Sequence, residues 1–184
     1  MGPFEYISVL LSIVISLALA HLLTAIAHMI DRGIRRFSIP LAQWIAFCLF
    51  LCVDYWFSIW RVHDQTVWTL PYVTLLLTQA ALIYVASWLI VPTKFGDEPV
   101  DLKAFFDRNR RKFMSIILIL ALVNEVTNLT LPGFGSLHIG ILILAWIVLL
   151  SVGIISKSER VQLAVAAANV ALTAHYAVTF VPAL

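Results

Sequence analysis

Six long apolar stretches, separated by short polar segments, account for most of the chain. A helix needs about 20 mainly apolar residues to cross the hydrocarbon core of a membrane. The stretches are continuous in Leu, Ile, Val and Ala and do not alternate every second residue, which argues against the strands of a membrane β-barrel. The predicted spans are Tyr6–Ile30, Leu41–Trp60, Val67–Val91, Lys112–Leu131, Leu137–Ile155 and Val161–Val181.

The connections between these spans are short, so spans adjacent in sequence are expected to pack antiparallel. The pattern therefore predicts an all-α, polytopic membrane protein with six transmembrane helices. Residues 1–184 form a single transmembrane domain in this interpretation.

The amino-acid composition supports a membrane protein and excludes several classes of function. Hydrophobic residues make up 62% and charged residues 12% of the chain, which excludes an ordinary soluble domain. A net charge of +2 is too balanced for a nucleic-acid-binding surface. The sequence has no nucleophile–base pair, nucleotide-binding loop or metal motif. We therefore expect no enzyme, no catalytic residue and no metal site. The sequence leaves the cofactor unknown, and associated lipid is expected.

The distribution of basic residues predicts the orientation. Eleven of the twelve Lys and Arg residues lie in the loops after spans one, three and five, and only Arg61 lies on the opposite side. Basic residues concentrate on the cytoplasmic side of a membrane. Both termini are therefore expected on the outer side.

The longest polar segment, around residues 93–111, is expected to be cytoplasmic and amphipathic. Asp101 is a candidate N-cap, and Leu102, Phe105 and Phe106 recur at helical spacing among basic residues that include Arg110. We interpret it as a helix on the membrane surface that runs into span four, with its apolar face towards lipid. Docking of a cytoplasmic partner is the alternative.

The two halves of the chain, 1–92 and 101–184, resemble each other. Ser12–Leu19 aligns with Ser115–Leu122, and in spans three and six Gln79 aligns with Asn169. Three spans per copy would place the second copy upside down, giving the 3+3 inverted repeat of many transporters. Few Gly or Pro residues interrupt the spans, however, which favours a stiff bundle over a moving carrier.

Polar residues within the spans give the candidate site. Ionisable groups at membrane depth are costly and need partners, and three spans carry them in their outer halves. We predict an outward-facing polar cluster of Asp54, Arg61, Asn124, Glu125, Asn128, His175 and Tyr176. Such a cluster could relay protons or select a cation, or it could simply join the helices by hydrogen bonds.

Secondary candidates lie outside this cluster. His21 and His28 share one face of span one, in its inner half. No other span offers a histidine at that depth, so haem ligation within one chain is not expected. Interhelical hydrogen bonding is the alternative role for His21. Gln79 and Asn169 are the remaining secondary candidates.

The segments Phe4–Ile13, His21–Leu23, Asp101–Phe106 and Asn109–Arg111, with Tyr55-Trp56, resemble a widespread family of small six-span bacterial inner-membrane proteins of unassigned function. The family usually has two tryptophans where this chain has Tyr55-Trp56. The resemblance implies a bacterial inner membrane but no activity. In that membrane, the outer side predicted for both termini from the basic residues is the periplasm.

Three functions follow as hypotheses. The first is an accessory or scaffolding subunit that packs against other membrane components or against itself. The second is a small ion or proton channel or transporter that uses the Asp/Glu/His cluster. The third is a subunit associated with a pigment, a quinone or haem.

Overall fold

The computed structural model describes residues 2–93, 99–130 and 137–180. Each of its six helices is long and apolar enough to span a membrane, which confirms the predicted all-α, six-helix fold of a multi-pass membrane protein. The helices are α1 (Pro3–Arg32), α2 (Ile39–Trp60), α3 (Leu70–Ile90), α4 (Leu102–Thr130), α5 (Leu137–Ile155) and α6 (Glu159–Phe180). The predicted end points Leu131 and Val181 lie outside the described residues.

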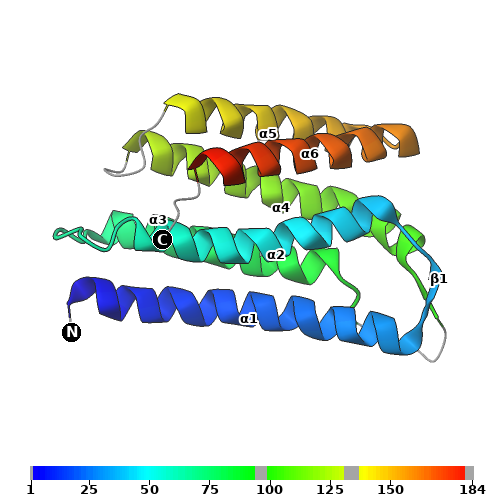
Figure 1. Ribbon diagram of the computed structural model, residues 1–184, viewed down its shortest axis with the longest axis horizontal. Coiled ribbons are helices and arrows are strands. Elements are labelled where there is room, and N and C mark those ends of the chain that lie inside the picture. The colour runs from blue at the N-terminus through cyan, green and yellow to red at the C-terminus, as the bar shows by residue number, and fades with distance from the viewer. Residues whose placement is uncertain (1, 94–98, 131–136, 181–184) are drawn as a thin grey trace.

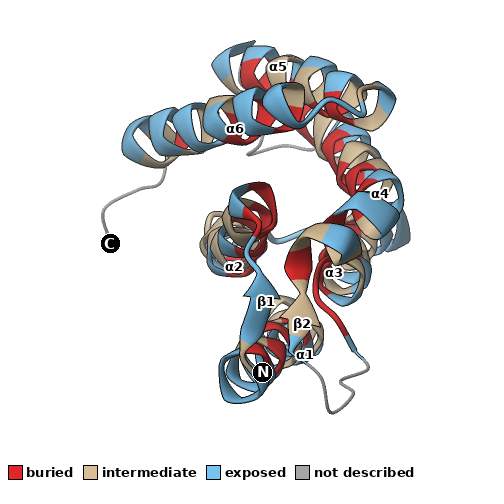
Figure 2. Cartoon of the chain, turned by 90° about the vertical axis from the view of Figure 1, so that its right-hand side faces the viewer, coloured by how far each residue is buried: buried red, intermediate tan, exposed pale blue. Residues whose placement is uncertain are grey.

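Five helices form an arc around the sixth. Packing runs from α1 to α3, then to α4, α5 and α6, and α2 lies inside this arc against α1, α3 and α6 (Figure 2). The first turn of α1 and the last turn of α6 lie at the same end of the bundle (Figure 1). The central position explains why α2 has the largest buried share of any span, 44%, against 17% for α6.

Helix starts follow local chemistry. The hydroxyl oxygens of Ser38 and Thr69 accept hydrogen bonds from backbone amides at the beginnings of α2 and α3, and a proline occupies the first turn of each helix. The first backbone amides of a helix lack an intrahelical acceptor. A capping hydroxyl accepts a hydrogen bond from one of them, and proline has no amide hydrogen to satisfy. The Thr69 cap explains why α3 begins at Leu70 and not at the predicted Val67.

The amphipathic segment before span four differs from its prediction. Asp101 accepts a hydrogen bond from the Ala104 amide at 2.9 Å, as an N-cap does, and α4 continues unbroken from Leu102 to Thr130. However, Leu102 and Phe106 are only 4% and 3% exposed. The expected lipid-facing surface is therefore wrong, because the protein core covers these side chains. Residues 94–98 of the predicted loop lie outside the described part.

Two short strands anchor this end of α4. β1 (Ile34–Arg36) pairs in parallel with β2 (Val100–Asp101), with Ile34 opposite Val100. The pair links the segment after α1 directly to the start of α4 (Figure 2). No periodicity in the sequence predicted it, since the strands contain only three and two residues.

Arg110 also lies elsewhere than expected. It is 5% exposed, and its guanidinium donates to the carbonyl oxygens of Gly153 and Ser156 at the end of α5. The Gln162 amide donates to the same two oxygens at 2.9 Å. Carbonyls in the last turn of a helix lack intrahelical partners. Arg110 therefore caps α5 and does not face solvent.

The predicted inverted repeat is not confirmed. In the first half, α1 packs extensively on α3, whereas the equivalent pair α4 and α6 makes almost no contact. The two halves therefore differ in packing, and the repeat stays a prediction from sequence.

Candidate functional site

A cavity of about 130 Å³ lies between α2 and the helices α3 to α6. Its wall combines a polar group of residues with a larger apolar group. The polar residues are Asp54, Ser58, Arg61, Gln79, Asn124, Thr127 and Asn128, joined by the hydroxyls of Tyr55 and Tyr176. The cavity exists because α2 lies inside the arc and packs little against α4.

The polar residues concentrate towards one end of the cavity. Asp54 and Ser58 lie one turn apart in the last part of α2, Arg61 follows directly after this helix, and Tyr176 lies near the end of α6. Asn124 lies near the end of α4. Because neighbouring spans are antiparallel, the ends of α2, α4 and α6 meet on one side of the bundle, which is the predicted outer side.

Arg61 joins two helices at this end. Its guanidinium donates to the Tyr176 hydroxyl at 3.4 Å and to the backbone oxygen of Phe180 at 3.3 Å. The carboxyl of Asp54 interacts with the same hydroxyl and with the charge of Arg61. The opposite charges of Asp54 and Arg61 therefore offset each other beside the Tyr176 hydroxyl. Arg61 also hydrogen-bonds a backbone carbonyl in the last turn of α6, as basic residues commonly do at helix ends.

Some polar atoms at this end have no protein partner. In the described part of the chain, Oδ1 of Asp54 and Nε of Arg61 are buried and make no hydrogen bond. A buried polar atom without a partner is costly, and native proteins usually satisfy it with water or a ligand. These two atoms provide one free acceptor and one free donor at the cavity.

The other end of the cavity is apolar. Phe47, Ile117 and Leu150 line it and are only 7%, 4% and 1% exposed. Trp44 and Phe113, which stack edge to face at 5.5 Å, are fully buried within the same core cluster. The cavity therefore has an apolar floor and a polar mouth.

Five of the seven residues predicted as the polar cluster line this cavity: Asp54, Arg61, Asn124, Asn128 and Tyr176. Gln79, a secondary candidate, lines it as well. Its amide donates to the Thr127 hydroxyl at 2.6 Å, which joins α3 to α4.

Glu125 does not join them, and this corrects the predicted cluster. Its carboxyl faces α5, where a Cβ added to Gly140 would lie 3.3 Å from Glu125 Oε1 and 3.3 Å from Asn128 Nδ2. Asn124, Thr127 and Asn128 line the cavity, whereas the Glu125 carboxyl lies in the interface between α4 and α5, in the space that Gly140 leaves open.

His175 is the second correction. It is exposed on α6, whereas its neighbour Tyr176 is buried and faces the cavity. The inward stripe of α6 includes Gln162, Val165, Asn169 and Tyr176, and position 175 lies off this stripe. Within the described residues, no three His, Cys, Asp or Glu side chains group closely enough to hold a metal ion.

Asn169 takes part in a separate contact between α5 and α6. It is fully buried, and its Oδ1 accepts a hydrogen bond from the Trp146 indole at 2.9 Å. Trp146 also lines the cavity, and it is not among the site residues predicted from the sequence. Its position in the middle of a span, where interfacial tryptophans are not expected, was the available signal.

The two histidines of α1 lie away from the cavity. The His21 ring stacks on Trp88 of α3, with the ring centroids 4.1 Å apart and the planes 9° from parallel. The expected hydrogen-bonding role of His21 is therefore replaced by stacking, and its buried Nε2 has no hydrogen-bond partner among the described residues. His28 is exposed, one turn from the end of α1.

Comparison with known proteins does not assign the chain to a family. No protein-family model matches the chain, and no curated protein and no solved structure matches it.

Proposed function

We propose that this protein is a non-enzymatic membrane protein that binds a small amphipathic molecule in the cavity between α2 and α4–α6. The observation that carries the proposal is the pair of unpartnered buried atoms, Asp54 Oδ1 and Arg61 Nε, above an apolar floor. Ligand sites typically combine an apolar wall with a few convergent polar groups.

The polar mouth indicates the chemistry of the head group. Asp54 offers an acceptor and Arg61 offers a donor, and their charges offset each other. A fully charged head would be repelled by one of the two residues. A neutral head that both donates and accepts, such as a hydroxyl, satisfies both atoms at once.

The volume limits what the cavity holds. Pockets for drug-sized ligands span about 300–1,000 Å³, whereas this cavity measures about 130 Å³. A cavity of about 150 Å³ is known to accommodate benzene. The fitting ligand is therefore a single ring or a short chain with a hydroxyl, or the equivalent head of a larger molecule such as a quinol.

Fluorine NMR in detergent tests this proposal with 4-fluorophenol and fluorobenzene, which differ in the hydroxyl. We expect a bound resonance for 4-fluorophenol, distinct from the micelle resonance, and weaker binding of fluorobenzene. Ala121→Phe places a ring in the cavity and should abolish the bound resonance. The matched control Ala171→Phe, on the exposed face of α6, should retain it.

A second variant separates the polar mouth from the apolar floor. Asp54→Leu removes the acceptor, so it should weaken 4-fluorophenol binding about tenfold, as loss of a charged hydrogen-bond partner commonly does. Fluorobenzene binding should change little. Equal affinity of the wild type for both probes, or the absence of any bound resonance, would refute the proposal.

A scaffolding role is the second candidate, and the exposed face of α6 favours it. This helix buries only 17% of its span, and Ala164, Ala167, Ala171 and Ala174 form an exposed stripe along it. Small residues at spacings of three and four allow membrane helices to approach closely. Cross-linking of Ala171→Cys into a dimer or onto a neighbouring subunit in native membranes would support this role.

The channel hypothesis has less support. It required Asp54, Glu125 and His175 to meet, and only Asp54 lines the cavity. The floor offers no titratable side chain among the residues that line the cavity, so a proton that reached Asp54 would have no further group to bind on that path.

We also propose that the chain lies in a bacterial inner membrane with both termini in the periplasm. The location is supported by the family resemblance, and the orientation by the eleven basic residues on one side.

A further inference from the structure

A second cavity lies at the opposite end of the bundle, where the basic residues gather. It has a volume of about 600 Å³ and lies between the segment before α2, the first turns of α4 and the start of α6. The residues that line it are Phe37, Ser38, Ile39, Pro40, Lys103, Phe106, Asp107, Arg108, Arg110, Arg111, Lys157, Glu159, Gln162 and Leu163. We refer to it as the basic groove.

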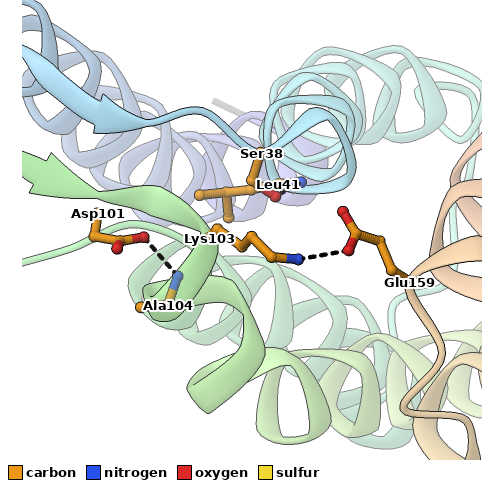
Figure 3. Close-up of polar contacts among 6 residues, drawn as sticks. All are labelled: Ser38, Leu41, Asp101, Lys103, Ala104 and Glu159. Atoms are coloured by element: carbon orange, nitrogen blue, oxygen red, sulfur yellow. Dashed lines mark hydrogen bonds and ion pairs between the residues drawn. The ribbon is translucent and has the colours of Figure 1, made fainter.

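The groove carries an excess of positive charge. Five basic side chains line it, against two acidic ones, Asp107 and Glu159. Lys103 and Glu159 form an ion pair at 2.9 Å that joins α4 to α6, close to Ser38 at the start of α2 (Figure 3). Arg110 already donates hydrogen bonds to the carbonyl oxygens at the end of α5. Three exposed cations remain for a ligand: Arg108, Arg111 and Lys157.

Apolar side chains lie beside these cations. Phe37, Ile39 and Leu163 line the same groove and are 61%, 64% and 39% exposed. A free inorganic anion makes no use of such a surface. An anionic phospholipid does, because its phosphate meets the cations while its glycerol and acyl chains cover the apolar residues.

The position of the groove, at the ends of the membrane-spanning helices, agrees with a phospholipid ligand. Ile39 and Glu159 begin α2 and α6, and Arg108 and Arg111 lie in the first three turns of α4. Phosphates of the lipid headgroups lie at the ends of membrane-spanning helices, and basic pockets between helices on the cytoplasmic side bind such headgroups. We propose that the basic groove is a specific binding site for the phosphate of an anionic phospholipid.

This proposal goes beyond general attraction of basic residues to a membrane, so its test compares two matched sets of cations. The groove variant is Arg108→Gln, Arg111→Gln and Lys157→Gln. The control variant is Arg35→Gln, Lys112→Gln and Arg160→Gln, three exposed residues that do not line the groove. Both variants remove two arginines and one lysine from the side that is predicted to be cytoplasmic.

Native mass spectrometry of the detergent-purified full chain measures lipid adducts after addition of phosphatidylglycerol or phosphatidylcholine. We expect one strong phosphatidylglycerol adduct on the wild type and on the control variant. In the groove variant its apparent affinity should fall at least tenfold, since each basic residue near the headgroup contributes to attraction. Equal losses in both variants, or no loss in either, would overturn the proposal.

A parallel titration with inorganic phosphate separates the two sources of phosphate. Binding of millimolar phosphate without preference for phosphatidylglycerol would overturn the lipid assignment. Photo-cross-linking of wild-type protein with a diazirine phosphatidylglycerol gives a readout that does not depend on the folding of any variant. Labels should concentrate on residues 37–40 and 106–111, and labelling spread evenly over the helices would contradict a specific site.

Discussion

The end of α5 offers a direct test of how this bundle is held together. The carbonyl oxygens of Gly153 and Ser156 each accept hydrogen bonds from both Arg110 and Gln162. Each carbonyl therefore keeps one partner when either side chain is removed. Both carbonyls lose their side-chain partners when the two are removed together, so the two substitutions should be strongly coupled.

The expected magnitudes follow from these contacts. Arg110→Met removes a charged donor, for which about 1.5 kcal/mol is the low end of the usual range. Gln162→Leu removes a neutral donor, worth about 1 kcal/mol. The double variant also leaves the buried carbonyl of Gly153 and the partly buried carbonyl of Ser156 unsatisfied, so it should cost about 4 kcal/mol. The resulting coupling free energy is about 1.5 kcal/mol, near the upper limit of about 1.7 measured between membrane helices.

The assay is unfolding of the purified protein by a denaturing detergent, followed by far-ultraviolet circular dichroism, for the wild type and the three variants. Lys112→Met, an exposed neighbour on α4, is the control and should change stability by less than about 0.5 kcal/mol. Additivity of the two single variants within about 0.5 kcal/mol would refute the shared-carbonyl reasoning.

Three further predictions test other parts of the structure. Gly153→Ala places a Cβ 2.8 Å from the sulfur of the fully buried Met114; displacement of this flexible side chain opposes the gain of about 1 kcal/mol in helix propensity from Gly to Ala, so thermal unfolding should show no net stabilisation, and a gain of the full ~1 kcal/mol would show that Met114 moves aside at no cost. Asp101→Ala removes the cap of α4 and should cost about 1 kcal/mol in the same measurement, whereas unchanged stability would show that the cap is dispensable. A membrane-impermeant maleimide added to intact cells should label Asp64→Cys but not Arg35→Cys, over a low background because both native cysteines are buried; labelling of both positions would reject the predicted orientation.

The sequence alone determined the number of helices and where most of them begin and end. Hydrocarbon thickness and helical rise fix the length of a span, and proline, serine and threonine mark its start, so these features are local. Tyr176, Asp54 and Arg61 could be selected in the same way, because an ionisable or hydroxylated side chain inside an apolar run is conspicuous. Antiparallel neighbours then place them on one side of the bundle.

Only the tertiary structure decided which of these side chains meet. A helix turns by about 100° per residue, so Tyr176 faces the cavity while His175 points away, and Asn124 faces it while Glu125 contacts α5. The face that each helix presents to the cavity depends on the helices packed against it. Here α2 lies inside an arc of the other five helices, and the order of residues along the sequence does not specify this arrangement. For the same reason Arg110, one basic residue among several in sequence, became the buried cap of α5, because the end of that helix happens to lie against it.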